Sequence, residues 1–255
     1  MDALYNAAKP RVVAIGGPTA TGKTALSVAL AKRFGGEIIS ADSMQIYQGL
    51  DVGTAKVTPE EMQGVPHHLV GFLAPEQAFS VADFTTLAGK TITQLTAQGK
   101  LPLIVGGTGL YITSLLNGIG FTPEKVDPAI RQELQARLQA EGSQALYAEL
   151  AAVDPGYAAK VHPNNPPRVI RALELYRATG RKMSAEREAA RPAEKPYRSL
   201  CLCLTCRDRT LLYQRIDTRC DSMMQSGILE EAKLVYDHRD TYRTAAQAIG
   251  YKEFF

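Results

Sequence analysis

The sequence predicts an α/β fold in which a parallel sheet is covered by helices on both faces and carries an inserted helical lobe. Over residues 1–120, short apolar runs alternate with segments whose apolar residues recur at helical spacing. Glycine-rich loops follow two of these runs directly, and residues 121–197 change to Ala, Gln, Glu and Arg in helical patterns. We therefore expect a core of residues 1–120 and 198–255, and a lobe of residues 121–197.

The individual elements follow from local pattern. Short apolar runs predict strands at residues 12–15, 37–41, 101–105 and 199–204. Helical spacing of apolar residues predicts helices at residues 24–34, 81–98, 210–225 and 228–236. Gly35 and Gly36 should end the first helix, and Ser80 with Asp83 three residues later predicts a capped start for the second. The run of Pro and Asn at residues 162–167 should break the lobe in the middle.

Composition excludes several classes of protein. Of the 255 residues, 45% are hydrophobic and 22% are charged, so the chain can bury a sizeable core, unlike a disordered or collagen-like chain. No apolar run approaches the roughly 20 residues that cross a bilayer, and the first residues carry no signal or transit pattern. We therefore expect a cytoplasmic protein without membrane segments. Separately, we expect a monomer. No stop signal follows residues 248–255, so the chain is expected to stop within an element.

Charge and cysteine are both unevenly distributed. Residues 161–191 hold seven Lys/Arg against three Glu, in a chain whose net charge is only +3. Such a segment indicates either a polyanionic partner or a solvated helix face. Cys201, Cys203, Cys206 and Cys220 are expected to be buried reduced thiols rather than a metal cluster, because Cys203 and Cys206 would lie on opposite faces of a strand.

The strongest single motif is a phosphate-binding loop. The pattern G-x-x-x-x-G-K-[ST], between an expected strand and an expected helix, is matched by Gly17, Pro18, Thr19, Ala20, Thr21, Gly22, Lys23 and Thr24. In such a loop the backbone amides and the helix N-terminus surround a phosphate, the lysine adds positive charge, and the hydroxyl binds Mg²⁺. The sequence therefore predicts a P-loop NTPase-like sheet that binds a diphosphate, with Mg²⁺ held through Thr24. The alternative is a glycine turn that merely joins strand to helix.

An acidic residue is expected near this loop. P-loop proteins that hydrolyse nucleotides usually have a strand that ends in a metal-binding acid, but the run at 101–105 ends in Gly106-Gly107-Thr108-Gly109. Asp42 instead follows the second expected strand, and adjacent parallel strands open on one crevice. Asp42 is therefore a candidate general base, or else it caps the turn that contains Ser43. The glycine-rich loop would bring the Thr108 hydroxyl to the same edge.

Two further pairs of residues allow two interpretations each. Arg215 and Arg219 lie four residues apart on an expected helix, where they either add positive charge for the diphosphate or pair with the neighbouring Asp217 and Asp221. His67 and the adjacent histidine have no third ligand at metal spacing and are interpreted as structural. A diphosphate loop, a nearby acid and a basic lobe together favour group transfer onto a polyanionic acceptor.

These motifs together resemble those of the tRNA dimethylallyltransferases of bacterial type, enzymes that prenylate the adenosine next to the anticodon. The resemblance covers nearly the whole chain. It is carried, in the family's order, by GPTATGKT at 17–24, SADSMQIY at 40–47, DVGTAK at 51–56, PHHL at 66–69, GGTGLY at 106–111, PPRVIRALE at 166–174 and QAIGYKE at 247–253.

The resemblance implies both a reaction and roles for residues. It implies transfer of the dimethylallyl group from dimethylallyl diphosphate to N6 of adenosine 37 in the anticodon stem-loop of tRNA, with Mg²⁺ required. It implies that Asp42 is the general base and that Thr108 and Arg219 are catalytic. It implies tRNA contacts by Asp42, Ser43, Met44, Gln45, Thr108, Arg131, Pro167, Arg168, Val169, Ile170 and Arg171.

Three alternatives stay open at this point. An adenylate isopentenyltransferase would perform the same chemistry on a free nucleotide, but it would not need the long insertion or Arg168 and Arg171. A P-loop small-molecule kinase would hold ATP in the same loop, although the sequence lacks a lid arginine pattern. In a nucleotide-gated RNA-binding protein without catalysis, Asp42 would be dispensable.

Overall fold

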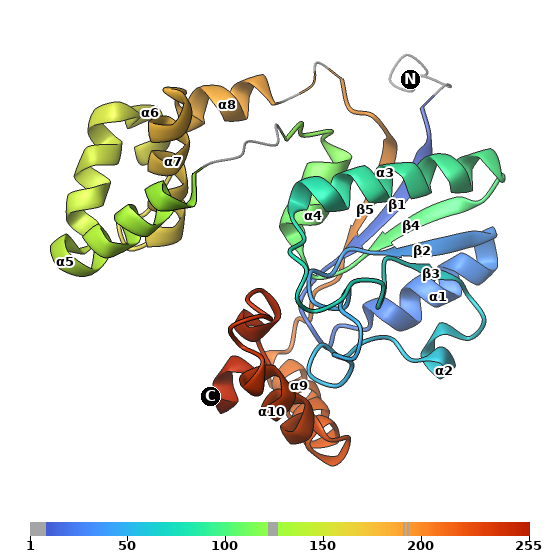
Figure 1. The fold of residues 1–255 in the computed structure, drawn as a ribbon. Coiled ribbons are helices and arrows are strands. Elements are labelled where there is room, and N and C mark those ends of the chain that lie inside the picture. Colours follow the sequence, from blue (N-terminus) through green and yellow to red (C-terminus); the bar gives the residue numbers. More distant parts are fainter. Residues whose placement is uncertain (1–8, 122–126, 191, 193) are drawn as a thin grey trace. The chain divides into compact units, whose positions relative to one another are not determined.

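The central element of the fold is a fully parallel sheet. The computed structural model describes residues 9–121, 127–190, 192 and 194–255. Within them, one five-stranded sheet has the order β3-β2-β4-β1-β5, and every neighbouring pair is parallel (Figure 1). The strands are β1 (Arg11–Gly16), β2 (Gly36–Ser40), β3 (His67–His68), β4 (Leu101–Val105) and β5 (Arg198–Cys203). The predicted α/β class is confirmed.

Helices cover both faces of the sheet. Helix α1 (Lys23–Phe34) lies on one face, and α3 (Val81–Ala97) with α4 (Gly109–Leu116) lies on the other (Figure 1). Consecutive strand residues therefore enter different cores: Ile38 packs in the cluster that includes α1, and Ile39 packs in the cluster that includes α3 and α4. A strand that is buried on both faces can be apolar at consecutive positions, as β2 is at Ile38 and Ile39.

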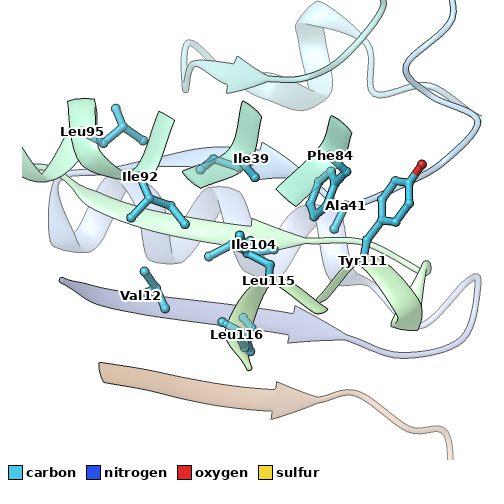
Figure 2. Close-up of a cluster of buried hydrophobic side chains, with 12 residues drawn as sticks. Val12, Ile39, Ala41, Phe84, Ile92, Leu95, Ile104, Tyr111, Leu115 and Leu116 are labelled. Atoms are coloured by element: carbon cyan, nitrogen blue, oxygen red, sulfur yellow. The ribbon is translucent and has the colours of Figure 1, made fainter. Parts of the chain in front are cut away.

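The cluster on the α3 and α4 face is tightly built around aromatic rings. Figure 2 shows Phe84 from α3 beside Tyr111 from α4, in the same cluster as the strand residues Ile39 and Ile104. The rings of Phe84 and Tyr111 are stacked, with centroids 4.3 Å apart. Because α4 begins directly after the glycine-rich loop that follows β4, this packing fixes the position of that loop at the edge of the sheet.

Most predicted elements occur close to their predicted bounds. Ser80 Oγ accepts a hydrogen bond from Asp83 N at 3.2 Å, and Asp83 Oδ2 accepts one from Ser80 N at 2.8 Å, so the predicted capping box is confirmed. Gly35 ends α1 in the left-handed conformation, at φ 62°. The helices α9 (Arg209–Gln225) and α10 (Ile228–Asp237) also match, whereas the short α2 (Pro59–Met62) and β3 were not predicted. The 3₁₀ turns η2 (Ala245–Gln247) and η3 (Lys252–Phe254) follow α10.

The chain divides into two compact units. One comprises Met1–Gly118 and Glu194–Phe255, and the other comprises Ile119–Ala193. The second unit, here called the lobe, contains α5 (Pro128–Val153), α6 (Pro155–Ala158), α7 (Pro166–Thr179) and α8 (Met183–Ala189). Helix α5 is interrupted at Gly142, whose φ of 81° and ψ of 171° are not helical. No helix among the described residues is long and apolar enough to cross a membrane.

The prediction of buried cysteines is wrong. Cys201, Cys203 and Cys220 are exposed, and Cys206 is half-buried. Strand β5 is an edge strand that pairs only with β1, and the aromatic cluster on the α3 and α4 face contains no β5 residue. Leu202 packs against the cluster on the α1 face, so Cys201 and Cys203 point to the uncovered side. The described residues contain no group of three or more His, Cys, Asp or Glu arranged for a metal ion.

Candidate functional site

Three loops meet at the carboxyl edge of the sheet because β4 lies between β1 and β2. The phosphate loop follows β1, the Gly106–Gly109 loop follows β4, and Asp42 follows β2. Their first residues continue the sheet pairing, since Gly106 N donates to Ile15 O at 3.1 Å and Ala41 N donates to Val105 O at 2.8 Å. Strands β1 and β2 are not direct neighbours, because β4 and its glycine-rich loop lie between them. The phosphate loop and Asp42 nevertheless line one pocket.

The backbone of the phosphate loop depends on glycine. Gly17 has φ 145°, and a Cβ atom there would collide with the carbonyl of Leu204. Gly22, at φ 85°, opens helix α1. Within the loop, Thr21 Oγ1 donates to Pro18 O at 2.8 Å. The loop therefore ends on the N-terminus of α1, where free amides and the helix dipole favour an anion.

A pocket of about 360 Å³ opens at this edge. It brings together residues from all three loops and from α9. Its lining includes Thr19, Ala20, Thr21, Gly22, Lys23, Thr24, Asp42, Gln45, Gly106, Gly107 and Arg219. Thr54 and Ala55 form another part of the wall. Many of the residues that the sequence predicts for phosphate and substrate line this pocket, whereas Gly17, Pro18 and Thr108 are not among its lining residues.

Basic side chains converge on the phosphate loop. Lys23 Nζ donates to Gly17 O at 3.0 Å and to Pro18 O at 2.7 Å, and Arg219 Nη1 donates to Thr19 Oγ1 at 3.0 Å. Burial lowers the pKa of Lys23, the charge of Asp42 opposes this shift, and the charge of Arg219 adds to it. Arg219, on α9, thus contacts a loop residue that lies 200 positions earlier in the sequence. Arg215, on the same helix, is exposed and does not line the pocket.

Asp42 has one oxygen in the local turn and one directed elsewhere. Its Oδ1 accepts from Met44 N at 2.9 Å and from Gln45 N at 3.3 Å, so the predicted turn-capping role is real. Its Oδ2 has no hydrogen-bond partner in the part of the chain that the structure describes. Thr108 Oγ1 accepts from Ser43 N at 3.0 Å and so ties the glycine-rich loop to the same turn. Asp42 can thus hold the turn and still present a carboxylate oxygen to a ligand.

The two histidines occupy different environments. His68 Nε2 lies 2.7 Å from Glu37 Oε2, as expected of a structural residue. His67 Nδ1 lies 2.8 Å from Val65 O, but this residue also lines the pocket, together with Glu61. Burial lowers the pKa of His67. Neither pocket residue was expected, because β3 has only two residues and α2 only four, too few to form a visible pattern.

The residues of the pocket fit a magnesium ion bound together with phosphates. Thr24 lines the pocket beside Lys23, and its hydroxyl is a hard oxygen ligand of the kind that Mg²⁺ prefers. Mg²⁺ usually keeps several waters and takes few protein ligands plus phosphate oxygens. A site of this type needs no cluster of acidic side chains.

Comparisons with known proteins agree with this geometry. The IPP transferase family model matches residues 45–255, and the isopentenyl transferase model matches residues 10–71. The chain is 50% identical to a tRNA dimethylallyltransferase of Bacillus subtilis over 250 residues, which cover 98% of this chain and 79% of that protein. The chain belongs to the tRNA dimethylallyltransferase family. The enzymes of Halalkalibacterium halodurans and Bacillus velezensis are 47% and 49% identical to it.

Solved structures support the same membership. A tRNA isopentenylpyrophosphate transferase from Bacillus halodurans matches with a TM-score of 0.65 and 46% identity, over 96% of this chain and 76% of that one. A eukaryotic dimethylallyltransferase acting on tRNA matches with a TM-score of 0.78 and 32% identity, over 96% of this chain and 62% of that one. The family's fold therefore extends along nearly the whole of this chain.

The lobe residues that the resemblance marks for tRNA have two distinct environments. Arg131 and Arg171 both bind the buried carboxylate of Glu174: Arg131 Nε lies 2.9 Å from Oε1 and Arg171 Nη1 lies 2.8 Å from Oε2. Hydrogen bonds from these arginines hold the pKa of Glu174 below its usual range, against the effect of burial. Both arginines stay about half exposed, so they can support the lobe and still face solvent.

The segment at the start of α7 alternates between core and surface. Val169 and Ile170 are buried in the lobe core, so their side chains hold the helix in place rather than face a partner. Pro167 and Arg168 are exposed, and Arg168 forms no ion pair within the described residues. The lobe as a whole carries eleven Lys/Arg and nine Asp/Glu, a smaller excess than residues 161–191 suggest. Any polyanion would therefore meet a few specific arginines rather than a broadly basic surface.

Proposed function

We propose that this chain transfers the dimethylallyl group of dimethylallyl diphosphate to N6 of adenosine 37 in tRNA. One observation carries the proposal beyond family membership: a single pocket presents a phosphate loop, two basic side chains and an acid. The basic residues Lys23 and Arg219 suit the diphosphate, and Asp42 suits the proton of the acceptor. A passive binding protein would not need an acid opposite the phosphate loop, whereas a kinase could use one as a base, so the experiment below compares prenyl transfer with ATP turnover.

The chemistry requires a base because the acceptor is weak. The lone pair of the exocyclic nitrogen is delocalised into the adenine ring, so the nitrogen becomes a good nucleophile only as its proton leaves. The nitrogen forms a bond to C1 of the dimethylallyl group while the bond from C1 to the diphosphate oxygen breaks. The diphosphate leaves with that electron pair, and the carboxylate of Asp42 takes the proton.

The leaving group gains negative charge as this bond breaks. We assign its stabilisation to Lys23, Arg219 and the amides of the phosphate loop, which are in position before the reaction and act in a partly buried site. When bound through Thr24, Mg²⁺ supplies further charge neutralisation on the diphosphate. Thr108 holds Ser43 and thereby supports the turn on which Asp42 lies.

Incubation with dimethylallyl diphosphate and Mg²⁺ tests the proposal directly. Parallel incubations would contain unmodified tRNA, AMP or no acceptor, each with and without ATP, and the masses of the adenosines would be measured by mass spectrometry. We expect one prenyl mass on tRNA adenosine and none on AMP. Addition to AMP alone would mean an adenylate isopentenyltransferase. Turnover of ATP without any prenyl addition would mean a kinase and would overturn the proposal.

Arg168 provides a test of the lobe as the tRNA-binding part. We expect Arg168→Gln to weaken tRNA binding and to lower the slope of log affinity against log salt by about one, as for loss of one phosphate contact. Lys160→Gln, which removes the same charge from an exposed site elsewhere in the lobe, serves as the matched control. Filter binding over a range of salt concentrations gives both slopes. Equal slopes for the two variants would argue against a specific contact at Arg168.

A further inference from the structure

Two sequence motifs outside the phosphate loop contact each other through one carboxylate. DVGTAK at residues 51–56 forms a loop beside the pocket, and QAIGYKE at 247–253 follows α10. Neither has a role in the chemistry described above. Glu231, on α10, lies between them and binds both.

The carboxylate of Glu231 accepts hydrogen bonds from three consecutive backbone amides. Its Oε2 accepts from Asp51 N at 2.6 Å and from Val52 N at 3.0 Å, and its Oε1 accepts from Gly53 N at 2.8 Å. A carboxylate that accepts several amide hydrogen bonds holds the backbone in one conformation, because each bond is charge-assisted. The loop therefore depends on a side chain that lies about 180 residues further along the chain.

Tyr251 completes this arrangement from the other motif. Its hydroxyl donates to Glu231 Oε1 at 2.6 Å, and its ring is fully buried. Burial, and next the hydrogen bond to Glu231, raise the pKa of Tyr251, so the phenol stays protonated and remains a donor. A Cβ atom on Gly53 would collide with the Tyr251 ring, and Gly250 adopts φ 102° to place the tyrosine. Both glycines are thus needed for the two motifs to meet.

The loop held in this way is connected to Asp42. Gln45 Nε2 donates to Ala55 O at 2.9 Å and to Thr54 O at 3.4 Å, and all three residues line the pocket. The backbone N of Gln45 in turn donates to Asp42 Oδ1 at 3.3 Å. A continuous series of hydrogen bonds therefore runs from Tyr251 and Glu231, through the loop and Gln45, to Asp42.

We propose that Glu231 and Tyr251 are positioning residues that hold the 51–56 loop as a wall of the pocket and, through Gln45, keep the Asp42 carboxylate aimed at the acceptor. The proposal rests on the transfer reaction proposed above. In this proposal the motif at 247–253 affects the reaction although it lies outside the pocket. Because a misplacement of about 1 Å in a reacting group costs on the order of 10²-fold in rate, partial loosening of this loop should be visible in turnover.

Tyr251→Phe is the decisive variant because it removes one hydroxyl and keeps the buried ring. We expect kcat for tRNA prenylation to fall by about 10- to 100-fold, while tRNA affinity stays unchanged. Hydrogen exchange at the amides of residues 51–56 should accelerate. Glu231→Gln should accelerate the same amides more strongly, because it affects all of these bonds. Tyr242→Phe is the matched control, because Tyr242 belongs to the same buried cluster but its hydroxyl is not bonded to Glu231.

The outcomes separate this proposal from the reaction itself. If Tyr251→Phe accelerates exchange at 51–56 but keeps wild-type kcat, the contact is only structural and the proposal is overturned. A fall in kcat without faster exchange at 51–56 would also overturn it, since the effect would then not act through the loop. Absence of prenyl transfer by the unaltered chain would instead refute the proposed function, whereas exchange would still report on the contact.

Discussion

Replacement of Asp42 by Asn is expected to lower the rate of prenyl transfer by about 10²- to 10⁴-fold, the range typical of a lost general base. The side chain keeps an oxygen that can accept from Met44 N and Gln45 N, so the turn should persist. The amide, however, cannot take the proton from N6. Steady-state prenylation of tRNA, measured with saturating dimethylallyl diphosphate, gives the loss in kcat.

Comparison of Asp42→Ala with Asp42→Asn separates the two roles of this carboxylate. Alanine removes the base and also the acceptor that caps the turn, so it should lose activity and additionally loosen residues 43–45. We expect tRNA binding by the Asn variant to be nearly unchanged, as measured by filter binding. An Asn variant that turns over at the wild-type rate would leave only the turn-capping role and would remove Asp42 from the chemistry.

The sequence predicted the sheet well because each strand carries its own signal. The run at 101–105 is apolar at every position and ends in glycines, and the structure places β4 over the same five residues. The order of the strands in the sheet could not be predicted in the same way, because no local pattern shows that β4 lies between β1 and β2. That order depends on how the crossover helices pack, and it decides which loops meet at the pocket.

Errors at the periphery have similar physical causes. The alternation of Leu and Cys in β5 is typical of a strand with one buried face, but it does not reveal which face is covered at the sheet edge. The cysteines of β5 lie on its uncovered face, although cysteine is usually found in the interior. The wall of the pocket formed by α2 and β3 was missed because these elements are held by tertiary contacts rather than by their own pattern.

The sequence also could not predict which side chains that are far apart in the chain contact each other. Arg131 and Arg171 both bind Glu174, although 43 residues separate the first arginine from the glutamate. The sequence left open whether Arg219 serves the phosphate loop or pairs with acids on its own helix. Its hydrogen bond to Thr19 favours the first interpretation. Motifs identified these side chains as important, but only the fold shows which of them share a site.

Replacement of Lys23 by Met is expected to lower kcat for prenyl transfer by about 10²- to 10³-fold, as for other groups that stabilise charge developing in a transition state. Methionine keeps much of the length and apolar volume of the side chain but provides no positive charge. Arg219 and the loop amides remain, so binding of dimethylallyl diphosphate should weaken less than turnover. Lys32→Met, on the same helix but exposed and bonded to Gln63, is the matched control and should keep wild-type kcat.

The comparison between kcat and KM distinguishes a catalytic charge from a binding one. In the bond-breaking step negative charge moves onto the bridging oxygen of the diphosphate, so a cation at Lys23 should stabilise the transition state more than the ground state. We therefore expect the larger change in kcat and the smaller one in KM for the diphosphate. A variant with normal kcat and a raised KM would mean that Lys23 only binds substrate. Arg219 and the loop amides would then be the groups that stabilise the developing charge.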